Sequence, residues 1–498
     1  MERRGMPPKA TPISRQGYLP DLSPLLDEAT RARLRVPRSF SSPEVRSPPQ
    51  LDAALKAYPS RPPDALLLEL QQGLLPRESA PAERREGEGS ISGTVFNMCS
   101  STLGAGALSL PLAISQTGLL LGPLLLLVTA VATHYSCDLL VSALIQTNAR
   151  SYEQLTVRLY GKRAGVLVEL NIIIFCFGTV VAYTVAVGDI LLPLIRMPGV
   201  AALCPWLDRS SAMCIVWLLV MLPVSLADSM SQLQCTSLFG VAALSYLVLS
   251  VVAHALADSL FDARLDETFE LTPHAAPRLV NASEQSVSAL AIIMFAFTCQ
   301  VNVPLLYDEL KHRSAPRMRT VSRFAMALCL ILYSAIGVAG YADFGGNVQG
   351  NLLDNYSIGW GSLHARMMLP AFMAIALTVL MAYPLNIYPC RYALDVMICG
   401  GLGERFRRSR HVAWTLLLSC AGLLTALYVP GINVVFQLLG GTSSAFVCFM
   451  LPAAFGWSLD LQQVRGAGRL ACASLFLAGL AVGIGSTAVT LHTLFEPA

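Results

Sequence analysis

Charged residues are scarce in this chain of 498 residues: they make up 13% of it, whereas 54% is apolar and the mean hydropathy is +0.56. An average soluble domain has about 25% charged and about 45–50% apolar residues. The formal net charge is only +3, and the basic residues fall in short clusters between apolar runs, which gives no support for a nucleic-acid partner. The composition is typical of a multi-pass protein embedded in a lipid bilayer.

Motifs of metal and catalytic chemistry are also missing. No Cys-x-x-Cys pair or Cys/His ligand spacing is present, and most of the 13 cysteines lie inside apolar runs, where cysteine behaves as a small hydrophobic residue. A membrane-embedded protease would need paired acids, an HExxH motif or a nucleophile, and Gly188-Asp189 lacks the upstream glycine of a GxGD motif. We therefore expect no metal, no cofactor, no disulfide framework and no enzymatic activity.

The first 89 residues lack any apolar run that could cross a bilayer, and they contain 14 of the 30 prolines. They also lack the basic start and apolar core of a signal peptide. This composition predicts a disordered, Pro-rich cytosolic tail followed by a membrane domain over residues 90–498.

The apolar runs of the remaining chain predict an all-α membrane protein with eleven spans. We place them at about 91–117, 119–145, 165–195, 211–228, 235–257, 287–307, 321–342, 362–388, 412–429, 432–456 and 468–492. With a cytosolic N-terminus, the inner segments hold nineteen basic residues and the outer loops four, as the positive-inside rule requires. Two glycosylation sequons, at Asn281 and Asn355, fall in loops that this topology places outside, which predicts a glycoprotein.

The first span, within Ser90–Gly118, cannot remain one regular helix. Its middle is crowded by small, polar and helix-breaking residues: Ser100, Ser101, Thr102, Gly104, Gly106, Ser109 and Pro111. Each glycine costs about 1 kcal/mol and a proline about 3 kcal/mol in a helix interior, and in hydrocarbon the freed backbone groups survive only where they line a cavity or meet a ligand. We predict a break that binds a ligand at residues 100–106. Close packing against a neighbouring helix is the alternative interpretation of Gly104-Ala105-Gly106.

The sixth span contains a second break. Thr298, Gln300 and Asn302 alternate there, and Pro304 follows. Interrupted segments at matching places in two halves indicate a transporter built from inverted repeats, with the ligand between the broken helices. The repeats are then about 91–257 and 287–456, with helix eleven, 468–492, appended. The N-terminus of a half-helix suits a carboxylate, whereas its C-terminus and unwound carbonyls suit an ammonium group, so an α-amino acid fits both.

Several segments resemble the amino acid/auxin permease family, which includes neutral and vacuolar amino acid transporters. They are GTVFNMCSSTLGAGALSLPLAISQTG (93–118), VAYTVAVGD (181–189), FAFTCQVNVPLLYDEL (295–310), GYADFGGNVQGNLL (340–353), YPLNIYPCRYAL (383–394) and PGINVVFQLLGG (430–441). The resemblance covers about residues 90–492. It implies the bacterial leucine transporter fold, a 5+5 inverted repeat with helices 1 and 6 broken.

The resemblance also implies a site. The substrate carboxylate would lie near Leu103–Gly106 and the amino group near Phe295–Thr298, which makes the candidate binding residues Ser100, Ser101, Thr102, Leu103, Gly104, Ala105, Gly106, Phe295, Ala296, Phe297 and Thr298. Two departures from the family's usual residues argue against sodium coupling. Cys299-Gln300 stands where animal members usually carry Cys-His, and Leu380 and Ala382 stand where sodium-coupled members bring a threonine hydroxyl.

Acidic residues in the apolar runs are candidates for proton coupling. Asp189 and Glu169 lie in or near the third span. For Asp189 the alternative is an interfacial cap near the outer end, whereas Glu169 lies only a turn from the cytosol, where a solvated or ion-paired helix end is the better interpretation. His134 and Asp138 share a helix face and form either a proton relay or a structural hydrogen bond. Phe436, together with the phenylalanines of the sixth span, either lines the pocket or packs in the core.

These observations predict a secondary active transporter that carries neutral amino acids by alternating access, with proton rather than sodium symport. An amino-acid sensor on the same fold, a sodium-coupled transporter and a uniporter are the alternatives. The predicted location is the plasma membrane or a vacuolar or lysosomal membrane. A channel is disfavoured because no repeated filter sequence or Arg-rich helix is present.

Overall fold

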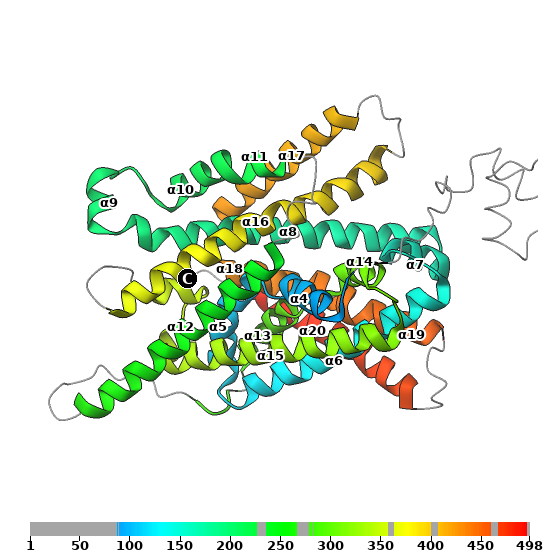
Figure 1. Cartoon of the computed structure of the whole chain (residues 1–498), viewed down its shortest axis with the longest axis horizontal. Helices are drawn as coiled ribbons and strands as arrows, with labels where there is room; N and C mark the ends of the chain where they lie inside the picture. The colour runs from blue at the N-terminus through cyan, green and yellow to red at the C-terminus, as the bar shows by residue number, and fades with distance from the viewer. Residues whose placement is uncertain are drawn as a thin grey trace, which may run out of the picture. The chain divides into compact units, whose positions relative to one another are not determined.

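The computed structural model describes residues 87, 89–226, 236–265, 278–281, 283–356, 363–399, 407–459 and 467–495, all of which belong to one compact unit, Glu86–Ala498. The predicted disordered tail lies outside the described residues apart from Gly87 and Gly89. Within the described ranges the regular structure is helical (Figure 1), as the apolar runs predict.

The helices of the first half are α4 (Ile91–Thr102), η2 (Ala105–Ser109), α5 (Leu110–Thr117), α6 (Leu121–Thr147), α7 (Tyr152–Tyr160), α8 (Lys162–Ile195), α9 (Pro198–Leu203), α10 (Arg209–Val216), η3 (Trp217–Met221), α11 (Leu222–Ser225) and α12 (Thr236–Leu265). Those of the second half are α13 (Glu284–Ala296), η5 (Gln300–Asn302), α14 (Val303–Glu309), α15 (Ala315–Phe344), η6 (Gly345–Asn347), η7 (Leu352–Asn355), α16 (Leu363–Cys399), α17 (Arg407–Tyr428), α18 (Ile432–Leu439), η9 (Gly440–Met450), α19 (Leu451–Ser458) and α20 (Ala467–Phe495).

The described residues contain nine helices long and apolar enough to cross a membrane, plus one bent pair, α4 with η2–α5, that passes the same test together. The expected fourth span appears as a shorter apolar stretch, Arg209–Ser225, next to residues that are not described. The count of eleven therefore stays a prediction. The eighth span runs to Cys399, beyond its expected end at 388, because membrane helices tolerate prolines such as Pro384 and Pro389 in their interior.

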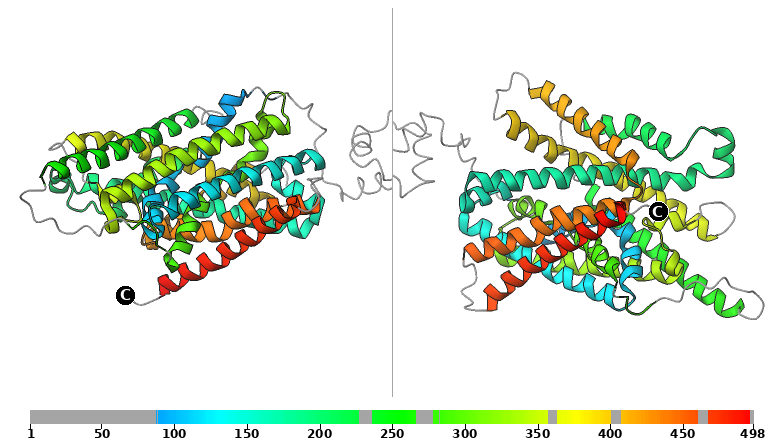
Figure 2. Two further views of the ribbon diagram at one scale, coloured as in Figure 1. Left: turned by 90° about the horizontal axis from the view of Figure 1, so that it is seen from below. Right: turned by 180° about the vertical axis from the view of Figure 1, so that it is seen from behind.

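The interrupted segments lie in the middle of the bundle. α13 packs against α5 and η2, and α15 packs along α4 and α6. In the most apolar stretch of the sixth span, 72% is buried inside the protein, whereas the corresponding share for α20 is 22%. Figure 2 shows α20, in red, at the margin of the bundle beside α18–α19, whereas α8 and α16 pack side by side in Figure 1. The outer helices thus enclose the two breaks.

Candidate functional site

The first break separates α4 from η2–α5, and the two parts are bent by 52°. Ser90 caps the start of α4 by accepting a hydrogen bond from Gly93 N at 3.0 Å. At the other end, Leu103 leaves helical geometry with ψ 88° and Gly104 is extended with φ −124° and ψ −160°. Pro111 stands in the first turn of α5, where its missing N–H costs least. The predicted interruption of the first span is confirmed.

The second break separates α13 from η5–α14. α13 ends at Ala296, and Thr298 and Cys299 are not helical before Gln300 starts a short 3-10 turn. Pro304 stands in the first turn of α14, as Pro111 does in α5. Both interruptions therefore have the same local order: a half-helix, two or three non-helical residues, a 3-10 turn and a half-helix with proline in its first turn.

Gln300 holds the second break in place. Its side chain is fully buried, and its Oε1 accepts a hydrogen bond from the unwound Cys299 N at 3.0 Å. Its Nε2 donates to Ser136 Oγ on α6 at 2.8 Å. An amide can donate and accept at once, so glutamine satisfies a backbone N–H that the break frees and ties it to a neighbouring span.

The two breaks are in direct contact. A Cβ atom on Gly106 would lie 3.2 Å from Ala296 Cα and 3.4 Å from Ala296 Cβ, so the absence of a side chain lets η2 approach the end of α13. The Tyr333 hydroxyl donates to Thr102 O at 2.8 Å and to Ala296 O at 2.9 Å. The structure thus brings together the residues that sequence reasoning placed in two separate segments.

Within this region three of the predicted hydroxyls bond to carbonyls of their own helices. Ser101 and Thr102 both donate to Met98 O at 2.8 Å, and Thr298 donates to Met294 O at 3.0 Å. Such bonds to the preceding turn are a common alternative for hydroxyls in helices. The hydrogen atoms of these hydroxyls are therefore used within the helices.

Ser100 lies on another face of α4. Its Oγ and the methyl group of Thr378 on α16 would each lie 3.5 Å from a Cβ on Gly240 of α12. Thr378 was not among the predicted residues, because sequence reasoning looked for a hydroxyl nearer to Pro384 and found Leu380 and Ala382. The eighth span does bring a hydroxyl-bearing residue close to the first.

Aromatic residues from three helices border the second break. Phe295 stacks on Phe436 of α18 with ring centroids 4.5 Å apart, and Phe175 of α8 lies 6.1 Å from Phe295. Phe297 instead packs edge-on against Tyr333, 5.2 Å away, so it belongs to the core. Tyr183 of α8 faces the first break: its hydroxyl would be 3.3 Å from a Cβ on Gly104. Phe175 and Tyr183 were missed because an aromatic residue in an apolar helix carries no distinguishing signal.

The acidic candidates occupy the ends of spans. Asp189 pairs with Arg209 Nε at 2.8 Å, and its side chain is only 9% exposed. Glu169 is half-buried on α8, away from both breaks in sequence. Asp138 forms two hydrogen bonds to Arg319, at 2.9 and 2.8 Å, while His134 Nδ1 meets Ser322 Oγ at 2.8 Å. Both latter contacts join α6 to α15, which favours the structural interpretation over a relay.

A further acid, Asp354 in η7, was not predicted. The residue is partly exposed to solvent, but the protein around its carboxyl group removes part of the hydration of the charged form. This desolvation and, second, the nearby Asp189 carboxylate raise the pKa of Asp354 to about 7. Arg209 and Arg196 oppose that rise. Asp354 and Asp189 thus form a charged group with two arginines at one end of the bundle.

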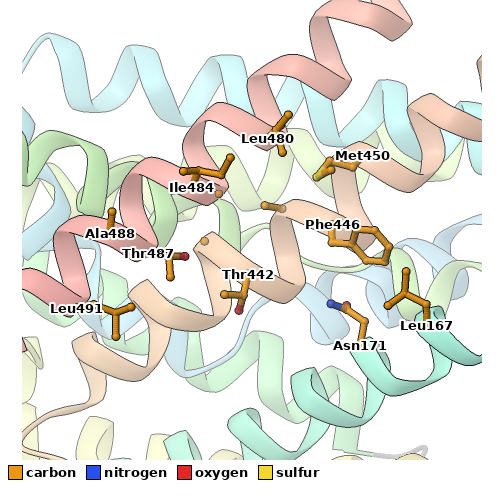
Figure 3. Close-up of a pocket in the computed structure, with 14 residues that line it drawn as sticks. Leu167, Asn171, Thr442, Phe446, Met450, Leu480, Ile484, Thr487, Ala488 and Leu491 are labelled. Carbon is orange, nitrogen blue, oxygen red and sulfur yellow. The ribbon is translucent and has the colours of Figure 1, made fainter.

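A cavity of about 600 Å³ lies elsewhere, between α8, η9 and α20 (Figure 3). Residues such as Leu167, Phe446 and Ile484 line it, and no charged side chain does. It includes no residue of either break. Asn171, Thr442 and Thr487 are the polar side chains in this otherwise apolar groove, and it has no charged partner for either charge of an amino acid. It is therefore a poor candidate for the substrate site.

The family described as transmembrane amino acid transporter protein matches residues 87–492. The chain belongs to this family. Its relatives include vacuolar amino acid transporter 5 of Schizosaccharomyces pombe, 28% identical over 82% of this chain and 95% of the relative. They also include amino acid transporter AVT6E of Arabidopsis thaliana, 27% identical over 75% of this chain and 77% of the relative. A third is sodium-coupled neutral amino acid symporter 2 of Danio rerio, 26% identical over 84% of this chain and 85% of the relative. Such relatives are transporters, not enzymes.

Solved structures support the fold. The structure of MhsT in complex with L-phenylalanine aligns with a TM-score of 0.52 at 13% identity, over 82% of this chain and 100% of that one. A manganese transporter of Eremococcus coleocola aligns with a TM-score of 0.50 at 12% identity, over 81% of this chain and 85% of that one. This family member therefore has neighbours of the leucine transporter fold.

Proposed function

We propose that this family member carries neutral amino acids by alternating access, with the substrate held between the two breaks and with proton symport. Family membership already supports amino acid transport. The observation that carries the finer proposal is the meeting of two interrupted helices, where the backbone of η2 approaches that of α13 at Gly106 and Ala296. Each interruption ends one half-helix and starts another, so it presents N–H groups on one side and carbonyl groups on the other.

The substrate carboxylate is assigned to the stretch Leu103–Gly106, at the start of η2–α5. Its donors there are the N–H groups that follow Leu103, because Leu103 N already donates to Cys99 O at 2.6 Å. A helix N-terminus carries roughly +0.5 charge and orphan donors, so it binds an anion without a basic side chain. The ammonium group is assigned to carbonyls at Phe295–Thr298, at the end of α13, where the dipole is negative. The hydroxyls of Ser101, Thr102 and Thr298 support these backbone turns.

The substrate side chain is assigned to the space bordered by Phe295, Phe436, Phe175 and Tyr183. No residue of this set is charged, and three of the four are purely apolar. A basic or acidic substrate side chain would lose its hydration there without gaining a partner. Neutral amino acids are therefore the proposed class.

Proton coupling is assigned to the Asp189–Arg209 pair together with Asp354. A carboxylate that alternates between a paired and an unpaired environment takes up and releases a proton as access alternates. A proton gradient supplies enough free energy for this: roughly 1.4 kcal/mol per pH unit, plus about 2.3 kcal/mol per 100 mV of membrane potential for each charge moved. The lack of side-chain oxygens at Leu380 and Ala382 speaks against sodium, while Thr378 beside Ser100 is the residue through which a sodium site would have to form.

The matching order of the two breaks, including Pro111 and Pro304, supports the proposed inverted repeat. The proposed cytosolic N-terminus is supported by the distribution of basic residues between inner and outer loops. Under this topology Asp189 and Asp354 face the external or lumenal side. The membrane is proposed to be the plasma membrane or a vacuolar or lysosomal one.

The test is uptake of a labelled amino-acid panel into proteoliposomes, with sodium and pH gradients imposed separately. Uptake should prefer neutral substrates, rise when the external or lumenal face is acidified, and persist when choline replaces sodium. Asp189→Asn and Asp354→Asn should each weaken the pH dependence. Strict sodium dependence would overturn proton coupling, indifference to both gradients would indicate a uniporter, and saturable binding without flux would indicate a sensor.

A further inference from the structure

A single buried hydroxyl joins the two breaks. Tyr333 lies in the middle of α15 with 0% of its surface exposed. Its hydroxyl is 2.8 Å from Thr102 O and 2.9 Å from Ala296 O. Thr102 is the last residue of α4 and Ala296 is the last residue of α13. One atom thus contacts the C-terminal carbonyl of each interrupted half-helix.

These carbonyls need a positive partner. The last carbonyls of a helix have no intrahelical donor, and the helix dipole adds roughly −0.5 charge at that end. Two such ends converge here in a water-poor interior, so their repulsion and desolvation have to be offset. In transporters with broken helices, half-helix C-termini and unwound carbonyls commonly coordinate a cation.

We propose that the Tyr333 hydroxyl occupies the position of a monovalent cation between the two breaks, and so makes this point of the transport cycle independent of sodium. The inference rests on the proposed function, because it concerns the ion requirement of the same site. The phenol oxygen, at hydrogen-bond distance from both carbonyls, leaves no space for an ion between them. Its hydrogen supplies the positive end that both carbonyls require.

The position of the hydroxyl is fixed by its ring. Phe297 packs edge-on against the Tyr333 ring with centroids 5.2 Å apart, and Phe297 is itself buried at the second break. Unlike an ion, the donor is covalently attached, so it does not have to be bound and released in each cycle. Tyr333 is therefore a specificity residue for the coupling ion, distinct from the residues assigned to the substrate.

The test compares Tyr333→Phe with Tyr152→Phe as a matched control. Tyr152 is also buried and also donates to a backbone carbonyl, Val447 O at 3.1 Å, which belongs to η9 and to neither break. Thermal unfolding of the purified proteins is measured in choline, potassium, sodium and lithium chloride. Uptake in the same salts follows in proteoliposomes.

Wild type and Tyr152→Phe should show the same midpoint in all four salts. Tyr333→Phe should unfold roughly 2 °C or more lower in choline, since it leaves two buried acceptors without a donor, and sodium or lithium should restore part of that loss. Its uptake in choline should fall at least about tenfold and recover in part with the same ions. The phenyl ring preserves the packing, so the newly gained ion response isolates the hydroxyl.

An unchanged ion response in Tyr333→Phe, or one equal to that of Tyr152→Phe, would overturn the proposal. If Tyr333→Phe cannot be purified, wild type is compared with Thr378→Val, which lacks the hydroxyl beside Ser100. A sodium-specific rise of the unfolding midpoint that persists in Thr378→Val would overturn the proposal, and an unchanged midpoint in both proteins would support it. The thermal measurement requires no transport, so it separates failure of this inference from failure of the proposed function, which would appear as absent amino acid uptake by wild type.

Discussion

Gly104 and Gly106 stand two residues apart at the first break, yet the structure predicts that an added methyl group acts differently at each. At Gly106 the new Cβ would lie 3.2 Å from Ala296 Cα, an atom of the helix backbone. Carbon atoms prefer about 3.5–4.0 Å, so the two breaks would have to separate by a few tenths of an ångström. At Gly104 the nearest atom is the Tyr183 hydroxyl at 3.3 Å, the end of a side chain that can turn aside.

Gly106→Ala should therefore lower stability by about 1–3 kcal/mol, as overpacking does in other cores, and it should reduce kcat because the halves of the site are displaced. Gly104→Ala should leave stability nearly unchanged, since the backbone at φ −124° accepts any residue. Its effect should be a KM raised about 2- to 13-fold, which corresponds to about 0.5–1.5 kcal/mol for one impaired hydrogen bond.

The assay combines thermal unfolding of purified protein with uptake kinetics in proteoliposomes. Wild-type stability and kcat in Gly106→Ala would refute the close contact between the breaks. Unfolding of Gly104→Ala with an intact KM in the remaining folded fraction would show that Gly104 serves packing and not the substrate.

Three further predictions address other parts of the structure. The pKa of Asp354 is raised to about 7, so folding is favoured when this carboxyl is protonated, and wild-type stability should fall as the pH rises from about 4 through about 7. Thermal unfolding measured in parallel should show a smaller fall for Asp354→Asn. Equal pH dependence of stability in the two proteins would refute the raised pKa. Ala488→Leu places a larger side chain in the groove between α8 and α20, so KM should stay within about twofold of wild type if the substrate binds elsewhere; a larger change in uptake kinetics would implicate the groove. Asn355 Nδ2 already donates to Asn347 O at 3.0 Å, so the glycan is expected on Asn281. In a glycosylating host, the gel shift on amidase treatment should disappear in Asn281→Gln and persist in Asn355→Gln. The reverse pattern would place the glycan on Asn355.

The backbone of the site was predictable from sequence, because its causes are local. Glycine, proline and clustered hydroxyls are unfavourable inside a helix, so their combination within apolar segments, at 100–111 and 298–304, indicates that the helix is interrupted there. The same residues did not reveal where their side chains point. Ser101, Thr102 and Thr298 turn back to the preceding helical turn, which depends on rotamers and not on composition.

Contacts between distant spans were not predictable. Tyr333 lies in an ordinary apolar helix, and only the tertiary arrangement brings its hydroxyl to both breaks. Arg209 was counted as one charge of an outer loop, although it pairs with Asp189 across a change of direction in the chain. Gly106 fits both the packing and the binding interpretations in the sequence. The position of Ala296 shows that it serves close packing between the two breaks, and its role in binding stays a prediction.

The central claim is that a neutral amino acid binds between the two breaks, and binding of a labelled neutral amino acid to purified protein tests it most directly. The comparison is between wild type and Gly104→Val. The new Cβ would have the Tyr183 hydroxyl at 3.3 Å as its nearest neighbour, with no backbone atom of another segment within 4 Å. Wild type should bind saturably, and Gly104→Val should unfold at a similar temperature but lose binding by at least about tenfold. Equal affinity in the two proteins would contradict the assignment of the substrate to this site.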